Sequence, residues 1–187
     1  MSGLTKTAIM DAFLQLLDEM PMERITVQDI VQRCGVSRNT FYYHYGDIYA
    51  LLEAVFRRDI QRLKDARPAG EPALEGLRRL AERVKARQRV FAHIYSSVNH
   101  DFLQRFLFQA TEEIFMEYIQ KTVQGLDIPD KDLHFVCYAY QSMLVGVFLN
   151  WVRDGMKSDL SETLELLHRI FFNNTRHMLQ SAQPPEP

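Results

Sequence analysis

At 187 residues and 47% hydrophobic content, the chain can bury a core and is long enough for one domain or two small ones. Its 22 basic and 24 acidic residues give a formal net charge of −2. Composition alone therefore does not identify the function. The opening MSGLTKTAIM lacks the apolar region and cleavage site of a signal peptide, which predicts a cytoplasmic protein.

Helical periodicity runs through almost the whole sequence. Apolar residues return every three or four positions and no stretch alternates as a strand would, which predicts an all-α protein. The first helix is expected from about Leu4 to Glu19, because Pro21 prevents its continuation. Its inward face should comprise Ala8, Ile9, Ala12, Phe13, Leu16 and Leu17.

The segment from Thr26 to Tyr45 predicts two short helices joined by a tight turn. Thr26 offers an N-cap side chain with an acid, Asp29, three residues on. Gly35 can adopt the left-handed conformation that ends the first helix, and Ser37 can cap the second. This pattern indicates a helix-turn-helix, although two capped helices around a glycine can also form a helical hairpin that never touches DNA.

The second of these helices carries side chains that suit a DNA duplex. Arginine can donate to guanine, asparagine can pair with adenine, and hydroxyl or imidazole groups reach phosphate oxygens. No acid lies between Asp29 and Asp47. The predicted DNA-binding residues are Thr26, Arg33, Ser37, Arg38, Asn39, Thr40, Tyr42, Tyr43 and His44.

Residues from about Thr5 to Phe56 resemble the DNA-binding domain of TetR-family transcriptional regulators. The resemblance rests on Ile25-Thr26-Val27, Asp29-Ile30, Gly35-Val36-Ser37, the run Thr40 to Tyr45, and Asp47. It implies an N-terminal three-helix helix-turn-helix domain followed by a helical ligand-binding and dimerisation domain. It also implies a homodimer on a palindromic double-stranded DNA operator, usually as a repressor.

The DNA-binding third is electrically neutral, which leaves a second interpretation open. Residues 1 to 67 hold nine Lys and Arg against nine Asp and Glu, and Ile48 stands where the family often has a phosphate-binding lysine. Modest non-specific DNA affinity is therefore expected. The alternative is a helical co-regulator or adaptor that acts through a protein partner. The run Tyr42 to Tyr49 also resembles regulators of dihydroxyacetone-kinase operons, which work with a protein co-regulator.

A domain boundary is predicted after the fourth helix. That helix is expected to start at Asp47 and to end at the segment Arg67 to Pro72, which contains two prolines and a glycine. The predicted organisation is a DNA-binding domain over 1–66, an effector-binding and dimerisation domain over 73–181, and a disordered tail over 182–187.

About three helices are expected between Ala73 and Gln124. The first is arginine-rich, which indicates a solvated face or, as the alternative, a second DNA contact. By the family resemblance, a small-molecule effector pocket lies among these middle helices, and a few polar groups in an apolar wall suit such a site. The candidate ligand-binding residues, each of which also has a structural interpretation, are His93, Tyr95, His100, Tyr118, His134 and Gln141.

The stretch Leu133 to Val152 contains no charged residue and is long enough to span a membrane. Its polar side chains favour a buried helix over an inserted one, because polar groups in lipid are costly. One face can pack on its own domain and another against a second subunit. The small-residue stripe of the predicted dimer interface comprises Ala139, Ser142 or Met143, Gly146 and Asn150.

The last helix is expected from Asp159 to about Leu179. Its apolar positions recur at spacings of three, four and seven, so it is predicted to complete a four-helix interface with its symmetry mate, as in TetR-family dimers. The residues it contributes are Leu160, Leu164, Leu167, Phe171 and Met178.

Sequence motifs of enzymes are missing. There is no glycine-rich phosphate loop, HExxH, CxxC or nucleophile elbow, which predicts a protein without catalytic residues or cofactor. Cys34 and Cys137 lie far apart inside helical patterns, which predicts buried thiols and no metal site or disulfide. The expected partners are DNA, an unknown small-molecule effector and a second copy of the chain, with no membrane.

Overall fold

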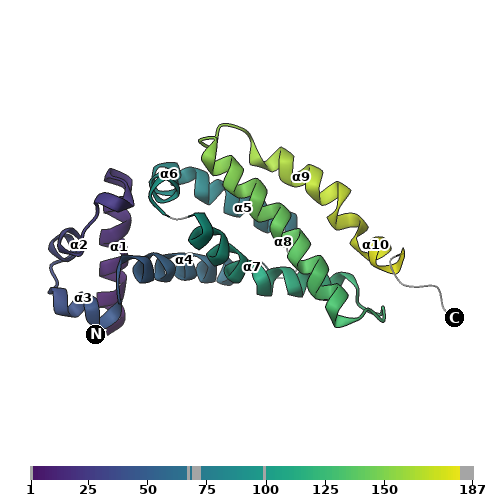
Figure 1. Cartoon of the computed structure of the whole chain (residues 1–187), viewed down its shortest axis with the longest axis horizontal. Coiled ribbons are helices and arrows are strands. Elements are labelled where there is room, and N and C mark those ends of the chain that lie inside the picture. The colour runs from purple at the N-terminus through teal and green to yellow at the C-terminus, as the bar shows by residue number, and fades with distance from the viewer. Residues whose placement is uncertain (1, 67, 69–72, 99, 182–187) are drawn as a thin grey trace. The chain divides into compact units, whose positions relative to one another are not determined.

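The computed structural model describes residues 2–66, 68, 73–98 and 100–181, and every regular element in these ranges is a helix (Figure 1). The predicted all-α class is therefore confirmed. The chain divides into two compact units, of which the first combines Met1–Pro68 with Val84–Leu103 and the second combines Ala69–Arg83 with Gln104–Pro187. The predicted domains 1–66 and 73–181 stay a prediction, and the predicted tail lies outside the described residues.

The first unit is organised around its N-terminal helix, α1 (Ser2–Glu19), which packs against α2, α4 and α6. The other elements of this unit are η1 (Met22–Arg24), α2 (Val27–Cys34), α3 (Arg38–His44), α4 (Ile48–Asp65), the end of α5 (Ala73–Ala86), α6 (Gln88–Ser97) and the start of α7 (His100–Thr122). The fully buried core side chains are Ile9, Phe13, Leu17, Ile30, Phe41, Leu51, Leu52 and Val55.

Polar contacts attach α4 and α6 to α1. The Nδ1 of His93 on α6 donates to the backbone carbonyl of Leu17 at 2.7 Å, since a carbonyl oxygen can only accept. The guanidinium of Arg58 on α4 donates to the carboxylate of Asp11 at 3.0 Å. Because both partners lie on the same helix, α1 serves as the frame on which the rest of the unit is assembled.

The second unit consists of long helices around an aromatic centre. It contains α5 as far as Arg83, α7 from Gln104, α8 (Asp130–Arg153), α9 (Leu160–Ile170), η2 (Phe172–Asn174) and α10 (Thr175–Ser181), with α9 and α10 running alongside α8 (Figure 1). Phe172 is buried, and its ring centroid lies 4.5 Å from that of Tyr140 on α8. The Tyr140 hydroxyl is 2.6 Å from the hydroxyl of Thr175, so the phenol is satisfied inside the core.

The last helix is interrupted, which corrects the prediction of one helix from Asp159 to Leu179. It ends at Ile170, and η2 precedes α10. The Asn174 side-chain amide donates to the Ile170 carbonyl at 2.8 Å, and the Thr175 hydroxyl donates to the Phe172 carbonyl at 2.9 Å. Asn and Thr side chains compete in this way for backbone groups, and the break turns Phe172 into the core.

Only one face of α8 is buried within its own unit. The buried residues are Cys137, Tyr140, Gln141, Leu144, Val145, Trp151 and Val152. Phe135 and Tyr138 are 69% and 61% exposed. By length and composition α8 could cross a membrane, a test that the core helix of a soluble protein also passes, and 39% of its most apolar window is buried. The Nε1 of Trp151, near the end of α8, donates to the Ser158 carbonyl at 3.0 Å and so links α8 to the segment that follows it.

Candidate DNA-binding surface and effector cavity

A reciprocal capping box starts the helix-turn-helix. The Thr26 hydroxyl accepts from the Asp29 backbone N–H at 3.2 Å, and the Asp29 carboxylate accepts from the Thr26 N–H at 2.8 Å and from its hydroxyl at 2.6 Å. These hydrogen bonds hold the pKa of Asp29 below its usual value. The Thr26 side chain is exposed, but its first role is to begin α2.

The turn between α2 and α3 forms as the sequence predicts. Gly35 has φ +71°, in the left-handed region that favours glycine, and it ends α2. Ser37 caps α3 by accepting from the Thr40 N–H at 3.0 Å. Phe41 is fully buried, so α3 is fixed with the opposite side of the helix outward.

The outer side of α3 presents a row of unburied side chains. Arg38 and Asn39, in the first turn, are exposed, and no hydrogen bond or ion pair engages either of them within the described part of the chain. Tyr42 and Tyr43 are 50% and 82% exposed. The remaining candidates are held more closely, since Thr40 is half-buried with its hydroxyl 2.8 Å from that of Ser37, and His44 is half-buried.

Arg33 is already engaged in an ion pair. Its two terminal nitrogens donate to the two carboxylate oxygens of Glu19 at 2.7 and 2.9 Å, a bidentate pair between α2 and the last residue of α1. The hydrogen bonds of this pair raise the pKa of Arg33 and lower that of Glu19. A DNA phosphate must therefore compete with Glu19 for this guanidinium.

The start of α4 follows α3 closely in sequence. The Asp47 carboxylate caps α4 by accepting from the Ala50 N–H at 2.7 Å. Ile48 is half-buried, so the position is partly open to solvent. On the next residue, the ring of Tyr49 packs edge-on against that of Phe102 at the start of α7, with centroids 5.3 Å apart.

The candidate effector residues are divided between the two units. His93, Tyr95 and His100 belong to the first unit, where His93 binds the Leu17 carbonyl and the Tyr95 ring lies 4.7 Å from that of His100. Tyr118 belongs to the second unit, where its hydroxyl donates to the Phe172 carbonyl at 3.2 Å. Each of these four residues therefore makes a contact within its own unit.

His134 and Gln141 do share a cavity, of about 290 Å³, between α7 and α8. The other lining residues are Phe108, Gln109, Glu112, Cys137 and Tyr138. Sequence reasoning did not select these five for a site. The spacing of 134, 137, 138 and 141 along one helix face was a usable signal, but the facing residues of α7 are set by packing alone.

The predicted dimer stripe is partly available for a partner. Ala139, Met143, Gly146, Leu167 and Phe171 are half-buried in the chain and Asn150 is exposed. Leu164 is a correction, because it is buried in its own unit together with Leu160, one turn earlier. The large exposed residues of α9 are instead Leu166 and Ile170, which share the opposite face at i, i+4 spacing.

The two cysteines differ in their surroundings. Cys137 is buried, as predicted, and burial raises the pKa of its thiol. Cys34 is only half-buried, which corrects the prediction for this residue, and its thiol donates to the Ile30 carbonyl at 3.1 Å. A position at the end of a short helix leaves one side of the thiol uncovered.

Two family models match the chain. The model of bacterial regulatory proteins of the TetR family matches residues 9–55, and the model of the transcriptional regulator C-terminal region matches residues 71–173. Among curated relatives, the HTH-type transcriptional regulator BetI of Escherichia coli (strain SE11) is 32% identical over 66 residues. That match spans 35% of this chain and 34% of BetI, about a third of the relative's length.

Solved structures are similar over nearly the whole chain. The dihydroxyacetone kinase operon activator DhaS superposes with TM-score 0.70 and 18% identity over 96% of this chain and 98% of DhaS. A TetR transcriptional regulator from Streptococcus agalactiae 2603V has TM-score 0.58 and 24% identity over 95% and 94%. NalD of Pseudomonas aeruginosa, the secondary repressor of the MexAB-OprM multidrug efflux pump, has TM-score 0.56 and 18% identity over 92% and 96%.

At these identities the solved structures establish the fold alone, an N-terminal helix-turn-helix followed by a helical region. The two family models together cover most of the sequence and include the segment with the exposed Arg38 and Asn39. The chain therefore belongs to the TetR family of bacterial regulatory proteins, which are DNA-binding transcriptional regulators and not enzymes.

Proposed function

We propose that this regulator works in the cytoplasm as a homodimer, binds a palindromic operator, represses the adjacent genes, and releases DNA when a small molecule binds. The observation that carries the proposal is the pair of exposed, unengaged side chains, Arg38 and Asn39, in the first turn of α3. In helix-turn-helix proteins, residues near the N-terminus of the second helix contact base edges in the major groove.

The remaining candidates on this surface suit backbone contacts. Hydroxyl, phenol and imidazole groups, with the N-termini of α2 and α3, can bind phosphates without reading sequence. We assign Arg38 and Asn39 to base edges, and the backbone set comprises Thr26, Ser37, Thr40, Tyr42, Tyr43 and His44. Arg33 joins the backbone set only by leaving Glu19.

Dimerisation is supported by apolar surface on the second unit. Phe135 on α8 and Leu166 and Ile170 on α9 are each at least 45% exposed. Exposed apolar residues that gather on neighbouring helices are typical of a protein–protein interface. A two-fold dimer would present two copies of α3 to the two halves of a palindrome.

The effector response is assigned to the cavity between α7 and α8. Helix α7 lines that cavity with Phe108, Gln109 and Glu112, and the same helix begins with Phe102 against Tyr49 of α4. A continuous helix that contributes to both places can transmit a displacement from one to the other. By linkage, an effector that weakens operator binding must itself bind the operator complex more weakly by the same factor.

Repression is proposed because a dimer bound at an operator can exclude polymerase without any further contact. Activation requires an additional surface for the transcription machinery. Among the similar structures, DhaS is named an activator and NalD a repressor, so the fold is compatible with both. A promoter–reporter assay distinguishes repression from activation. Loss of the regulator's gene raises expression from a repressed promoter and lowers it from an activated one.

The test of the proposal is selection of bound fragments from the source genome with purified full-length protein, followed by gel shift. A short inverted repeat should be enriched, and its binding should be lost in the double variant Arg38→Ala, Asn39→Ala. The matched control is the double variant Arg57→Ala, Gln61→Ala, which removes an exposed cation and an amide from α4. A random fragment set, or equal loss in both variants, would refute operator binding through α3.

The second candidate is a co-regulator that acts through a protein partner. It is favoured by the nine basic and nine acidic residues among positions 1 to 67 and by the uncharged Ile48. Absence of fragment enrichment even at low salt, together with co-purification of a defined partner, would support this function. Enrichment of a repeat by the purified protein alone excludes it.

A further inference from the structure

The cavity between α7 and α8 is lined by groups that accept hydrogen bonds. Glu112 contributes a carboxylate, and in the described part of the chain no hydrogen bond or ion pair engages it. The Gln141 side-chain amide donates to groups of the protein itself, to the Phe108 carbonyl at 2.8 Å and to the Thr111 hydroxyl at 3.1 Å. Among the described residues its carbonyl oxygen accepts from the weak Cys137 thiol donor alone, at 3.8 Å, and keeps acceptor capacity.

The electrostatics of the cavity are negative. None of the seven described lining residues is a lysine or an arginine, and Glu112 is the only acid among them. Burial is the main cause that raises the pKa of the Cys137 thiol, and the Glu112 charge adds to it. Glu112 is itself exposed, and a cation beside its carboxylate would be stabilised by the opposite charge.

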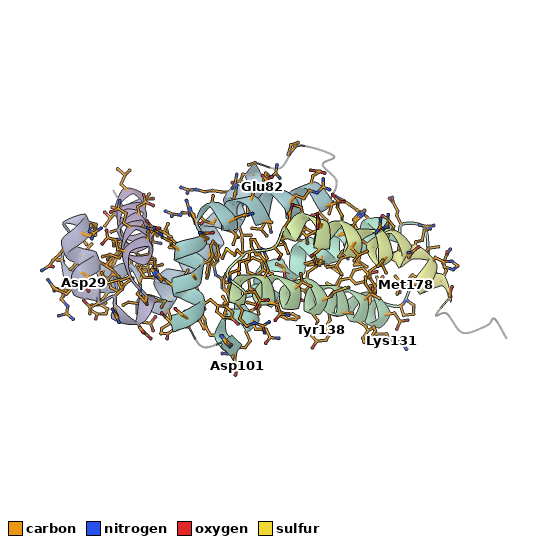
Figure 2. The ribbon with its side chains drawn as sticks, turned by 90° about the horizontal axis from the view of Figure 1, so that it is seen from above. Asp29, Glu82, Asp101, Lys131, Tyr138 and Met178 are labelled. Carbon is orange, nitrogen blue, oxygen red and sulfur yellow. The ribbon has the colours of Figure 1, made fainter. Side chains whose placement is uncertain are left out.

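Two aromatic rings complete the lining. The centroids of Phe108 on α7 and Tyr138 on α8 lie 5.6 Å apart with their planes tilted by 36°. Tyr138, labelled in Figure 2, is 61% exposed, so much of its surface is free for contact. The faces of such rings attract cations and apolar groups but not anions.

We propose that this cavity binds a small organic cation, in which an ammonium group pairs with Glu112 and lies against the rings of Phe108 and Tyr138 while an apolar body fills the remaining volume. The volume of about 290 Å³ lies at the lower limit for small-molecule sites, which restricts the ligand to a compact amine. The inference rests on the proposed effector response and adds the chemical class of the effector.

The experiment is calorimetric titration of the full-length protein with three phenyl compounds of similar size. These are 2-phenylethylammonium, the neutral 2-phenylethanol and the anion phenylacetate, all at pH 8. The cation should bind, and both analogues should bind about tenfold more weakly or not at all, because a charge-assisted hydrogen bond is lost. Benzyltrimethylammonium then shows whether the N–H donors or only the charge are needed.

Variants separate the carboxylate from general charge effects. Glu112→Gln should weaken binding of the cation about tenfold. Glu117→Gln is the matched control, because it removes the same charge from the same helix but its carboxylate pairs with Lys121 outside the cavity. Tyr138→Leu should also weaken binding, whereas Tyr138→Phe keeps the ring and should retain it. Thermal melting confirms that each variant is folded.

Three results would overturn the inference: no binding of 2-phenylethylammonium at millimolar concentration, equal binding of the neutral analogue, or equal effects of Glu112→Gln and Glu117→Gln. The proposed effector response fails in a different way. If the cation binds with the expected dependence on Glu112 but operator affinity is unchanged, the ligand class stands and the allosteric role does not. If phenylacetate alone binds the cavity and lowers operator affinity, the role stands and the class is wrong.

Discussion

The ring of Tyr49, in the first turn of α4, meets the ring of Phe102 at the start of α7 edge-on, with centroids 5.3 Å apart and planes at 74°. Tyr49 is the second residue of α4, which follows α3 after the connection 45–47. Phe102 lies six residues before Phe108, at the cavity wall on the same helix. This aromatic pair therefore joins α7 to the start of α4, the helix that follows α3 along the chain.

A double-mutant cycle on this pair should give a coupling free energy of about 0.5–1.5 kcal/mol in urea unfolding at fixed protein concentration. The changes are Tyr49→Ala and Phe102→Ala, singly and together. Tyr43→Ala with Phe102→Ala is the control cycle and should be additive, because the Tyr43 ring is 82% exposed on α3. Additivity in both cycles would mean that the ring contact contributes no free energy.

Arg33 should contribute little to the salt dependence of operator binding, because Glu19 already neutralises it. Arg33→Ala is expected to leave the slope of log affinity against log salt unchanged and to lower the melting temperature slightly. Glu19→Gln frees the guanidinium for a phosphate and should steepen the slope by up to about one unit. A shallower slope in Arg33→Ala alone would show that the pair opens on DNA.

Substitutions on the exposed side of α3 should fall into two classes by their effect on DNA binding. Arg38→Ala and Asn39→Ala are expected to relax preference at particular operator positions by about 1–3 kcal/mol, because each loses contacts with base edges. Thr40→Ala and His44→Ala should weaken all sequences similarly, since phosphate contacts carry no sequence information. Competition binding against single-base operator variants measures both, and unchanged selectivity in both Arg38→Ala and Asn39→Ala would mean that another surface reads the bases.

Ile48→Lys should tighten binding to operator and to random duplex alike. Ile48 is half-buried at the start of α4, so a lysine there can extend toward solvent. One added phosphate contact steepens the salt slope by about one unit and leaves the ratio of specific to non-specific affinity nearly constant. A lower melting temperature with an unchanged slope would assign the position to the core instead.

The purified protein should scatter light as a dimer of about 43.8 kDa, twice the 21.9 kDa of one chain. Gly146→Leu is expected to disrupt it at a cost of about 1–3 kcal/mol per subunit by overpacking a close helix contact. A Cβ at Gly146 meets nothing within 4 Å in its own chain, so the first atom of the new side chain fits there.

Ala92→Leu, at an exposed position of α6, is the control for added apolar surface and should remain dimeric. Sedimentation of both variants at micromolar concentration gives the comparison. A dimeric Gly146→Leu variant would remove Gly146 from the interface, and a monomeric parent protein would remove the interface itself.

The sequence by itself determined the helix-turn-helix because each of its signals acts between near neighbours. The Thr26 capping box, the left-handed Gly35 and the Ser37 cap all join residues within a few positions of one another, and buried Phe41 follows from helical periodicity. Local hydrogen bonds of this kind are specified by residue type and spacing, which are visible in one sequence.

Tertiary structure alone decided the contacts between residues far apart in the chain. Arg33 finds Glu19 fourteen positions away, and Gln141 reaches the Phe108 carbonyl thirty-three positions away. Leu164 and Met178 both belong to the apolar pattern of the predicted last helix, yet packing buries the first and exposes the second. Periodicity predicts that a helix has an apolar face. Which neighbouring helix covers each part of that face depends on how the helices pack.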